Sequence, residues 1–392
     1  MTGGTEGAGT GPVGSDFLVV GAGIAGAAAA YFLSRHGAVT VLEAERAPGV
    51  HATGRSSGLF SEYYGNPTVR SLTEASRGFY TRPPEGFCSA ELLHPRGVLA
   101  LETPGSAEAF DEAKVSGARA PQPVVEVDPA EARRLCPALR PEAFGRALYK
   151  PGACDVDVDA AHQGFLRGAR AAGGRIVTSA RVMGLSHRRG AWCARTPAGE
   201  FTAPLLVDAA GAWSDELARL AGVPPAGLVP RRRTAALVPV PPHDDGRERG
   251  VADWPMVADV AGTFYGRPES GGLLLSPVDE TPVPPGDVRP EDVDVALALE
   301  RFTAVVDLPL RHVRRAWAGL RTSPADDVPL VGPAPGADGF HRLAGLGGYG
   351  IQTAPAAGAL LAALVTGEPP PTGLEAAVPA LSPARNAGSV LR

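Results

Sequence analysis

Short apolar runs and longer apolar stretches follow one another along the chain, and their order predicts alternating strands and helices. Near the N-terminus, residues 16–20 and 39–43 are runs of strand length, and residues 24–35 form an apolar stretch of helical length between them. Strand, helix and strand in this order predict a βαβ unit with parallel strands. Another helix is predicted at 353–365. The remaining strands are predicted at 175–186, 191–195 and 205–207, and antiparallel hairpins at 234–241 and 256–277.

Parallel and antiparallel sheet patterns therefore alternate along the chain. This alternation predicts a mixed α/β and α+β fold, in which an antiparallel-sheet domain is inserted into a Rossmann-like nucleotide-binding domain. Segments 16–90, 151–225 and 322–370 are assigned to the nucleotide-binding domain, and segments 91–150 and 226–321 to the inserted, substrate-binding domain.

The two ends of the chain differ from the middle. Residues 1–15 are rich in Gly and Thr and predict a disordered leader, and residues 371–392 predict an extended or loosely packed tail. Residues 17–33 are apolar enough to suggest a signal peptide or a membrane span, but no Lys or Arg precedes them. The glycine spacing inside this run has a better explanation, given below, so we expect no membrane span and a cytoplasmic protein.

Composition narrows the class of protein. The chain has 392 residues, with 37 basic and 42 acidic side chains, and this balance argues against a nucleic-acid-binding surface. Only Lys114 and Lys150 are lysines, so the basic residues are almost all arginines. The four cysteines have no C-x-x-C spacing, which gives neither a zinc site nor a disulfide framework and fits a reducing compartment.

A glycine-rich turn joins the first predicted strand to the first predicted helix. Gly21, Gly23 and Gly26 form the pattern G-x-G-x-x-G around Ile24 and Ala25. Glycines at these places allow a tight turn, close approach to a pyrophosphate and close packing of helix on strand, and the helix N-terminus offers N–H groups to phosphates. The sequence therefore predicts a dinucleotide-binding site.

An acidic residue supports the same prediction. Glu43 ends the second predicted strand, where a carboxylate accepts hydrogen bonds from ribose hydroxyls. The loop that follows contains Arg55, Ser56 and Ser57 between glycines, and its hydroxyl and N–H groups suit phosphate and isoalloxazine contacts. This loop favours FAD over NAD, although an NAD-linked dehydrogenase remains an alternative.

Several strings together resemble the D-amino-acid oxidase superfamily of FAD-dependent oxidoreductases. They include GAGIAGA at 21–27, TGRS at 53–56, WAGLR at 317–321 and GGYGIQT at 347–353, and the resemblance extends over residues 16–367. Within the superfamily the chain is most similar to the bacterial D-arginine dehydrogenases. The resemblance implies transfer of the Cα hydride of a D-amino acid to flavin N5, followed by hydrolysis of the imino acid to a keto acid.

The resemblance also implies roles for individual residues. Those that bind the substrate carboxylate, receive the amine through a backbone carbonyl or otherwise line the catalytic site are Tyr64, Arg233, Tyr265, Arg321, Gly348 and Gln352. Those expected to contact FAD are Gly21, Gly23, Ile24, Ala25, Gly26, Glu43, Arg55, Ser56, Ser57, Val182, Ala210, Gly211, Gly347 and Gly350. The N-terminus of the helix at 353–365 is expected to stabilise negative charge on the reduced flavin. No residue pair indicates a general base, and no metal is expected.

The substrate side-chain pocket departs from the pattern of the D-arginine dehydrogenases. Val98 stands where those enzymes carry a carboxylate for the substrate guanidinium, and valine cannot pair with a cation. The positions expected to form this pocket are Leu59, Ser61, Glu62, Val98, Met256 and Ala258. We therefore expect a D-amino acid with a neutral or apolar side chain rather than D-Arg.

Two alternatives to D-amino-acid oxidation remain open. The first is amine oxidation with O₂ by an enzyme similar to glycine or sarcosine oxidases; no cysteine follows Cys193, so FAD is expected to bind without a covalent bond. The second is a protein that binds FAD without catalysis. The substrate side chain, the electron acceptor (a quinone or O₂) and the oligomeric state are not determined by the sequence.

Overall fold

The computed structural model describes residues 12–118, 121–242 and 250–386. One end of the molecule is built on a six-stranded sheet whose order is β10-β3-β2-β14-β21-β20. All neighbouring strands in it are parallel except β20 and β21. The strands are β2 (Phe17–Val20), β3 (Val39–Leu42), β10 (Arg175–Val177), β14 (Leu205–Asp208), β20 (Leu330–Pro333) and β21 (Phe340–Ala344).

Helices cover this sheet because its strands are apolar on both faces. Every residue of β2 and β3 is buried, as expected for parallel strands between helical layers. Helix α1 (Ile24–Leu33) packs against α5 (Val158–Ala171) and α8 (Gly350–Thr366), and α8 in turn packs against α2 (Pro67–Thr81). The predicted βαβ unit is thus present at the predicted place.

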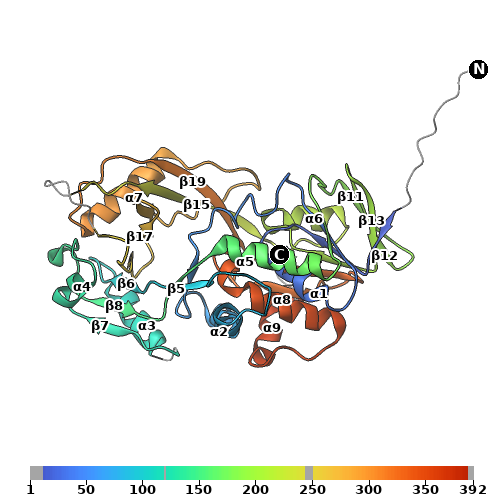
Figure 1. The fold of residues 1–392 in the computed structure, drawn as a ribbon, viewed down its shortest axis with the longest axis horizontal. Coiled ribbons are helices and arrows are strands. Elements are labelled where there is room, and N and C mark those ends of the chain that lie inside the picture. The colour runs from blue at the N-terminus through green and yellow to red at the C-terminus, as the bar shows by residue number, and fades with distance from the viewer. Residues whose placement is uncertain (1–11, 119–120, 243–249, 387–392) are drawn as a thin grey trace, which may run out of the picture.

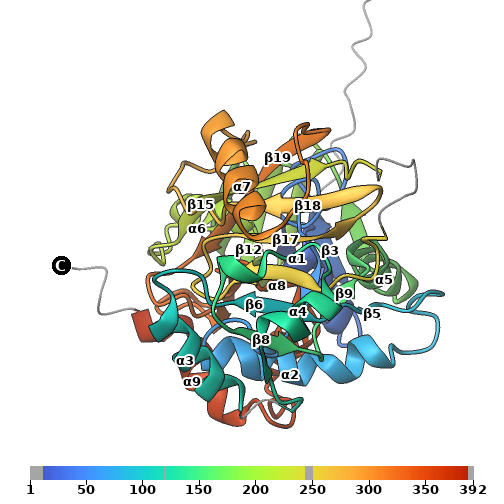
Figure 2. The ribbon, with the colours of Figure 1, turned by 90° about the vertical axis from the view of Figure 1, so that its left-hand side faces the viewer.

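The other end of the molecule is built on an eight-stranded, mostly antiparallel sheet (Figure 1). Its order is β19-β15-β18-β17-β16-β6-β8-β7. The strands are β6 (Val98–Leu101), β7 (Val125–Val127), β8 (Ala147–Lys150), β15 (Val229–Val238), β16 (Met256–Asp259), β17 (Tyr265–Glu269), β18 (Gly272–Ser276) and β19 (Arg315–Ser323). Helix α7 (Asp292–Val305) lies against β15 and β18 (Figure 2). These strands come from the segments assigned to the inserted domain, except that β19 extends two residues further.

Two small sheets and several short helices complete the fold. The first small sheet has the order β1-β13-β12-β11 and the second the order β4-β9-β5. Their strands are β1 (Val13–Gly14), β4 (Leu59–Phe60), β5 (Leu93–Pro95), β9 (Cys154–Val156), β11 (Gly184–Arg188), β12 (Ala191–Thr196) and β13 (Gly199–Ala203). The other helices are α3 (Ala107–Gly117), α4 (Pro129–Leu135), α6 (Ser214–Leu220) and α9 (Val378–Leu381), with 3₁₀ turns at Pro141–Ala143, Gly211–Trp213, Glu375–Ala377 and Pro383–Asn386.

Local sequence explains where several helices begin. Asn66 precedes α2 and its side chain accepts a 3.0 Å hydrogen bond from the N–H of Val69, while Pro67 occupies the first turn, where it costs no hydrogen bond. Helix α4 begins with a capping box in which Asp128 and Glu131 satisfy each other's N–H groups.

Four local predictions were wrong. The strand predicted at 175–186 is two strands in different sheets, β10 and β11, because the backbone turns between them with a left-handed residue at Ser179. The tail is not loosely packed up to residue 386, since Leu374 and Leu381 are fully buried in the core beside α8. The leader prediction fails at Val13–Gly14, which pair with β13, and residues 1–11 lie outside the described part. Helix α8 begins three residues earlier than predicted.

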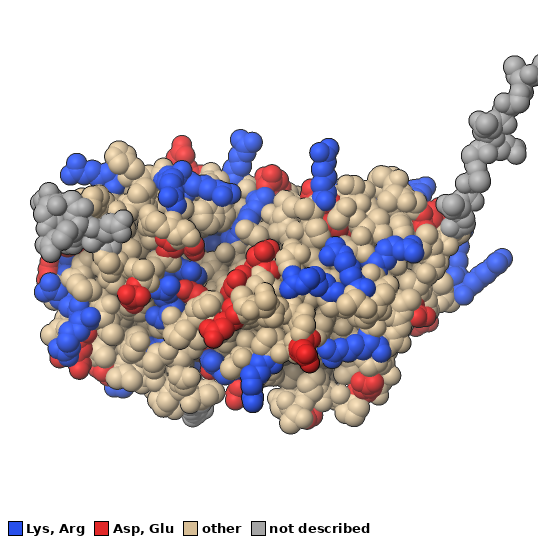
Figure 3. All heavy atoms as spheres, in the orientation of Figure 1, with Lys and Arg blue, Asp and Glu red and all other residues tan. Residues whose placement is uncertain are grey.

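The surface has no region of one charge on the face shown in Figure 3, where basic and acidic side chains are interspersed. Within the described residues, no helix has both the length and the apolar character needed to cross a membrane. The apolar run at 17–33 is divided between the buried strand β2 and the buried helix α1, which accounts for its composition.

Candidate functional site

The turn between β2 and α1 is so tight that two of its positions accept only glycine. Gly21 has a φ of +101°, and a Cβ there would lie 2.4 Å from the carbonyl oxygen of Ala209. A Cβ at Gly26 would lie 1.8 Å from the carbonyl oxygen of Gly21. Both contacts are far inside van der Waals distance, so the glycines allow α1 to begin directly against β14. The N-terminal end of α1 is therefore held at the carboxyl edge of the parallel sheet.

Three side chains contact backbone groups of this turn. Glu43 Oε2 accepts a 2.8 Å hydrogen bond from the N–H of Ala22. The hydroxyl of Thr53 accepts a 2.9 Å hydrogen bond from the N–H of Ile24. His162 Nε2 lies 2.8 Å from the carbonyl oxygen of Ala22. Burial lowers the pKa of His162, so the ring is neutral at pH 7 and donates to this carbonyl.

Thr53 and His162 are positioning residues that the sequence analysis missed. Their signals were present, because Thr53 begins the TGRS string and His162 lies in a buried face of α5. Neither residue lies within a recognisable spacing of the glycines. Only the packing of α5 and of the loop after β3 against the turn reveals their role.

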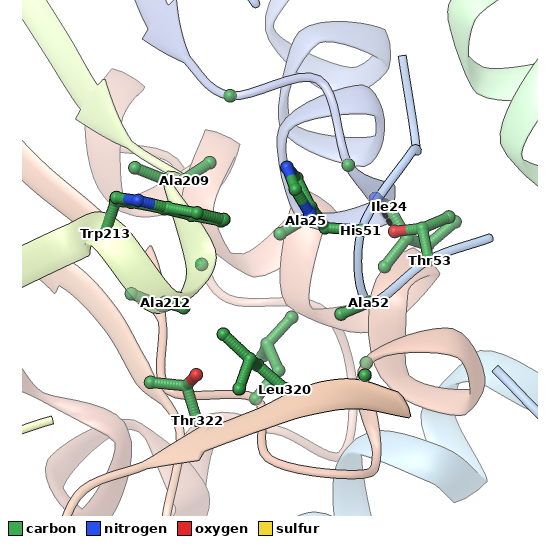
Figure 4. Close-up of a pocket in the computed structure, with 18 of the residues that line it drawn as sticks. Ile24, Ala25, His51, Ala52, Thr53, Ala209, Ala212, Trp213, Leu320 and Thr322 are labelled. Carbon is green, nitrogen blue, oxygen red and sulfur yellow. Dashed lines mark hydrogen bonds between the residues drawn. The ribbon is translucent and has the colours of Figure 1, made fainter. Parts of the chain in front are cut away.

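A cavity of about 290 Å³ begins at this turn and extends to the eight-stranded sheet. Figure 4 shows Ile24, Ala25 and Thr53 on one side of it, Ala209, Ala212 and Trp213 on the other, and Leu320 and Thr322 below. All residues predicted to contact the cofactor line this cavity except Gly26, which packs against Gly21. They are brought together from Gly21, Gly23, Ile24, Ala25, Glu43, Arg55, Ser56, Ser57, Val182, Ala210, Gly211, Gly347 and Gly350.

Arg55 borders the cavity, but its guanidinium binds other parts of the protein. Its Nη1 donates to the carbonyl of Ala318 at 2.8 Å and its Nη2 pairs with Asp287 at 2.5 Å. Its guanidinium is thus occupied by protein groups, and the prediction that Arg55 contacts the cofactor stays a prediction. Its contacts join the loop after β3 to β19.

Helix α8 begins at the same cavity. Gly345 and Gly347 have φ values of +68° and +55°, so the loop before α8 turns through conformations that favour glycine. Gly350 and Ile351, the first residues of α8, line the cavity. The N-terminal end of the helix, which carries partial positive charge, thus faces the same space as the N-terminal end of α1.

Two arginines meet at the end of the cavity beside the eight-stranded sheet. Arg321 on β19 lies directly opposite Arg231 on β15, and Arg233 lies opposite Gly319. Arg233 and Arg321 are therefore diagonal neighbours on one face of the sheet, and Gly319 leaves space beside them. Both line the cavity, as does Tyr265.

Each of these arginines is held by specific partners. Arg321 Nη1 donates a 2.9 Å hydrogen bond to the hydroxyl of Tyr64. A Cβ at Gly348 would lie 2.4 Å from the same nitrogen, so this guanidinium rests against the backbone of the loop before α8. Arg233 Nε donates to the carbonyl of Asp279 at 2.8 Å, and Nη2 pairs with Glu280 at 2.6 Å.

The two guanidinium groups make this end of the cavity strongly positive. Burial raises the pKa of Tyr64, but the charges of Arg321 and Arg233 and the hydrogen bond from Arg321 outweigh it, so the pKa is lowered. Burial and the charge of Arg321 lower the pKa of Arg233. Glu280 is largely exposed, and it is the carboxylate that pairs with Arg233. An incoming carboxylate would therefore meet a preformed cationic site.

Two predicted site residues have structural partners instead. Gln352 is buried; its Nε2 donates to the hydroxyl of Thr73 at 2.8 Å, and its Oε1 accepts from the N–H of Ser61 at 3.2 Å. Gln352 connects α8 to α2 and is not among the residues that line the cavity, so its role in the catalytic site stays a prediction. Glu62 forms two hydrogen bonds with Arg77, at 2.6 and 2.8 Å, and its carboxylate is not free for a substrate.

The predicted side-chain pocket is only partly assembled. Val98 and Met256 pack with Ala153, and Leu59 and Tyr265 pack against them in one apolar cluster, of which Tyr265 lines the cavity together with the two arginines. Ala258 lies opposite Tyr265 in the ladder of β16 and β17. Ser61 is buried against Gln352 and does not contribute its hydroxyl to the cavity. In the described residues, no group of three or more His, Cys, Asp or Glu side chains is arranged to hold a metal.

Comparisons with known proteins agree with this geometry. The profile of the FAD dependent oxidoreductase family matches residues 16–364. A glycine oxidase from Pseudomonas aeruginosa is 28% identical over 379 residues, which cover 90% of this chain and 95% of that protein. A mitochondrial dimethylglycine dehydrogenase from Rattus norvegicus is 26% identical over 382 residues. That match covers 91% of this chain but 43% of the relative, so the chain spans less than half of its length.

Solved structures show the same fold. An L-proline dehydrogenase from P. horikoshii is similar with a TM-score of 0.80 and 22% identity, covering 97% of this chain and all of that one. A glycine oxidase from Geobacillus kaustophilus is similar with a TM-score of 0.78 and 22% identity, covering 91% and 96% of the two chains. At these identities the similarity establishes the fold, and it confirms the predicted fold class.

Proposed function

The chain belongs to the family of FAD-dependent oxidoreductases, and from that premise we propose that it oxidises small amines that carry a carboxylate, of the glycine or N-alkylglycine type. FAD is the cofactor, as predicted. When bound, FAD supplies the two-electron oxidant for a C–H bond beside the amine nitrogen, and water then hydrolyses the resulting imine. The contributions of the chain are binding, orientation and charge.

The glycine-rich turn between β2 and α1 makes the cavity suitable for FAD. The Cβ that any other residue would place at Gly21 or Gly26 collides with backbone, so this turn is built for close approach of α1 to the sheet. The ends of α1 and α8 both open on the cavity, one suited to a pyrophosphate and the other to negative charge on a flavin ring. No cysteine follows Cys193 in the sequence, which favours non-covalent binding.

The observation that carries the proposal is the paired arginines at the far end of the same cavity. Arg233 and Arg321 are diagonal neighbours, with the Tyr64 hydroxyl bonded to Arg321. Guanidinium groups bind carboxylates with parallel hydrogen bonds, and a fixed pair orients the carbon attached to the carboxylate. We call Arg233, Arg321 and Tyr64 the carboxylate clamp.

The backbone beside the clamp suits the amine. Gly348 lies directly against Arg321, so a carboxylate on Arg321 would bring an α-amine near the loop that contains Gly348. In the proposed reaction the Gly348 carbonyl accepts a hydrogen bond from this amine. No titratable side chain in the clamp is a general base, and the ammonium loses its proton to solvent before oxidation.

The size of the substrate follows from the walls and from the relatives. Val98 and Met256 extend, on the same face of the sheet, the apolar surface of Tyr265, which lines the cavity, and this apolar wall carries no carboxylate, which disfavours a cationic side chain such as that of D-Arg. The relatives named glycine oxidase and dimethylglycine dehydrogenase favour glycine-type amines over larger D-amino acids. A small neutral D-amino acid is the second candidate, supported by the same apolar wall.

Anaerobic reduction of the flavin tests the proposal. The purified holoenzyme is mixed with glycine, N-methylglycine, N,N-dimethylglycine, D- and L-alanine and D-arginine while flavin absorbance is followed. We expect bleaching by the glycine-type amines and little by D-arginine. Bleaching by D-alanine alone would favour the second candidate, and no bleaching by any amine would contradict amine oxidation. Formation of H₂O₂ in air separates O₂ from other acceptors.

A variant tests the clamp itself. Arg321→Met removes the guanidinium while keeping similar length and retaining the apolar stem. We expect kcat/KM for N-methylglycine to fall at least about a hundredfold, because about 3 kcal/mol of charge-assisted binding is lost. The flavin content of the variant controls for folding. Unchanged kinetics would show that the carboxylate binds elsewhere.

A further inference from the structure

Lys150, the last residue of β8, lies over the ring of Tyr63 and pairs with no carboxylate in the described part of the chain. Among the described residues it forms no hydrogen bond or ion pair, and its Nζ lies 6.0 Å from the centre of the Tyr63 ring. The side chain is partly buried. The only other lysine, Lys114, is half-exposed and pairs with Glu126. A partly buried ammonium without a counter-ion is costly, and a bound anion would remove that cost.

A second cation, Arg70 on α2, is held by the carbonyl of Gly65, two residues after Tyr63, whose ring lies beside Lys150. Its Nε donates to the carbonyl of Gly65 at 2.8 Å and its Nη1 to the hydroxyl of Ser116, so these partners are neutral. No described carboxylate pairs with it. Burial, followed by the charge of Arg70, lowers the pKa of Lys150 to about 8, so both groups are mainly positive at neutral pH. This is the direction expected where two cations share a site without an acid.

Strand register places Lys150 on the substrate side of the eight-stranded sheet. Val98 lies directly opposite Lys150 in the ladder of β6 and β8, and directly opposite Met256 in the ladder of β6 and β16. Residues directly opposite each other share a face, so all three side chains lie on one face. Tyr265 is opposite Ala258, two residues beyond Met256, and therefore shares that face. Three strand spacings, about 14 Å, separate the backbones of Tyr265 and Lys150.

Two tyrosines connect the clamp to the segment that holds Arg70, because Tyr349 packs against Gly65, whose carbonyl accepts the hydrogen bond from Arg70 Nε. The rings of Tyr64 and Tyr349 are in edge contact, with centroids 4.8 Å apart. Tyr64 bonds to Arg321 on the side of the clamp. Tyr349 is close enough to Arg70 to influence its pKa electrostatically, although burial dominates and lowers it. Residues 63–65 therefore contact all three cations: Tyr63 lies beside Lys150, Tyr64 bonds to Arg321, and Gly65 bonds to Arg70.

We propose that Lys150 and Arg70 form a second anion site, at which this enzyme binds a distal carboxylate of its amine substrate. The proposal rests on the function proposed above. It assigns the substrate class as amines with two carboxylates, one held by the clamp and the other at the end of a side chain or N-substituent. The carbon chain between them lies along the apolar wall of Val98 and Met256, where no acid would repel it.

The test compares substrates that differ only in distal charge. N-(carboxyalkyl)glycines with spacers of increasing length are compared with the corresponding amides, which keep shape but lose the charge. The wild-type holoenzyme is expected to show a kcat/KM for the best acid about tenfold or more above that of its amide. The difference is expected mainly in KM, because the distal group lies far from the reacting carbon.

Variants assign the preference to Lys150. We expect the acid-to-amide ratio to fall about tenfold in Lys150→Met. The ratio is expected to persist in Lys150→Arg, which keeps the charge, and in Lys114→Met, which removes the other lysine. Lys150→Gln, which also removes the charge but keeps a polar side-chain end, keeps the test decisive if the methionine variant does not fold.

The outcomes separate the two proposals. Equal kcat/KM for acids and amides at every spacer length, or an unchanged ratio in Lys150→Met, would overturn the second anion site while glycine-type amines still reduce the flavin. If neither these compounds nor simple glycines reduce it, the proposed function itself fails. A lower ratio in Lys150→Arg equal to that in Lys150→Met would also contradict a charge-based site.

Discussion

The hydroxyl of Tyr64 accepts a 2.9 Å hydrogen bond from Nη1 of Arg321, a residue 257 positions later in the chain. The bond joins the segment before α2 to β19. It fixes one guanidinium of the carboxylate clamp against the loop that contains Gly348. The orientation of the clamp therefore depends on a residue that belongs to neither β15 nor β19.

Removal of this hydroxyl is expected to weaken substrate binding. Tyr64→Phe keeps the ring against Tyr349 and removes only the acceptor for Arg321. We expect KM for a glycine-type amine to rise about tenfold with a smaller change in kcat, since a hydrogen bond to a charged group contributes about 1.5 kcal/mol. Steady-state kinetics measure this effect. Tyr31→Phe is the control, because among the described residues that hydroxyl bonds only to Arg35, just beyond the end of α1. Equal effects of both variants would contradict the prediction.

Removal of the carboxylate beside Arg233 is expected to strengthen substrate binding. Glu280 is 63% exposed and pairs with Arg233 at 2.6 Å, where it competes with an incoming carboxylate. Glu280→Gln raises the net charge of the clamp by one, so KM for glycine-type amines should fall several-fold. The gain should shrink at high salt, because the added attraction is electrostatic. A KM that rises in this variant would indicate that Glu280 positions Arg233 instead.

Substitutions of Gly26 beside the turn and of Gly78 in α2 provide a variant and its matched control. Gly26→Ala would place a Cβ 1.8 Å from the carbonyl oxygen of Gly21, whereas Gly78→Ala in α2 meets nothing within 4 Å. We expect Gly26→Ala to yield protein without FAD or no folded protein. Gly78→Ala should keep full flavin content and gain about 0.5–1 kcal/mol in stability from helix propensity. Flavin absorbance and thermal unfolding of both variants check this, and FAD retention by Gly26→Ala would show that the turn can relax.

Asp208 gives the protein a predicted pH dependence of stability. It is fully buried at the end of β14, and burial raises its pKa to about 6 despite a hydrogen bond from Ser214. Because this pKa is higher in the folded than in the unfolded protein, its stabilising contribution is complete below about pH 4 and is lost as the pH rises through about 6. The loss is about 3 kcal/mol.

An amide in place of the Asp208 carboxyl group should remove this pH dependence of stability. Asp208→Asn cannot ionise and keeps polar atoms for Ser214 and for the N–H of Ala210. Thermal unfolding between about pH 4.5 and 8 should show a flatter profile for Asp208→Asn than for the wild type. The exposed Asp307→Asn should retain the wild-type profile. Parallel profiles for the wild type and Asp208→Asn would rule out Asp208 as the titrating group.

The parts of the site that depend on local spacing were predictable. Gly21, Gly23, Gly26 and Glu43 follow from the order of strand, turn and helix, because a tight turn admits few residue types. Arg233 and Arg321 were located by resemblance, and the structure brings them to one end of the same cavity. Their roles in binding a substrate stay predictions.

The parts that depend on distant partners were not predictable. Gln352 was expected in the catalytic site, but its side-chain amide donates a hydrogen bond to Thr73, which lies 279 positions away in the sequence. Glu62 was expected in the substrate side-chain pocket, but its carboxylate pairs with Arg77 on α2. No role could be predicted for Lys150, because the described side chains that surround its ammonium group are brought together only when β6, β8 and α2 pack against one another.

The sequence by itself determined the family, the cofactor and the βαβ turn that begins the cavity, because these depend on residue types at short spacings and backbone sterics limits what can stand there. Tertiary structure alone decided which polar side chains remain free to meet a substrate. A buried charge or amide takes whichever partner packing brings within about 3 Å. In this structure Gln352 and Glu62 bind side chains of α2, and Tyr64 binds Arg321. No described acid pairs with Lys150.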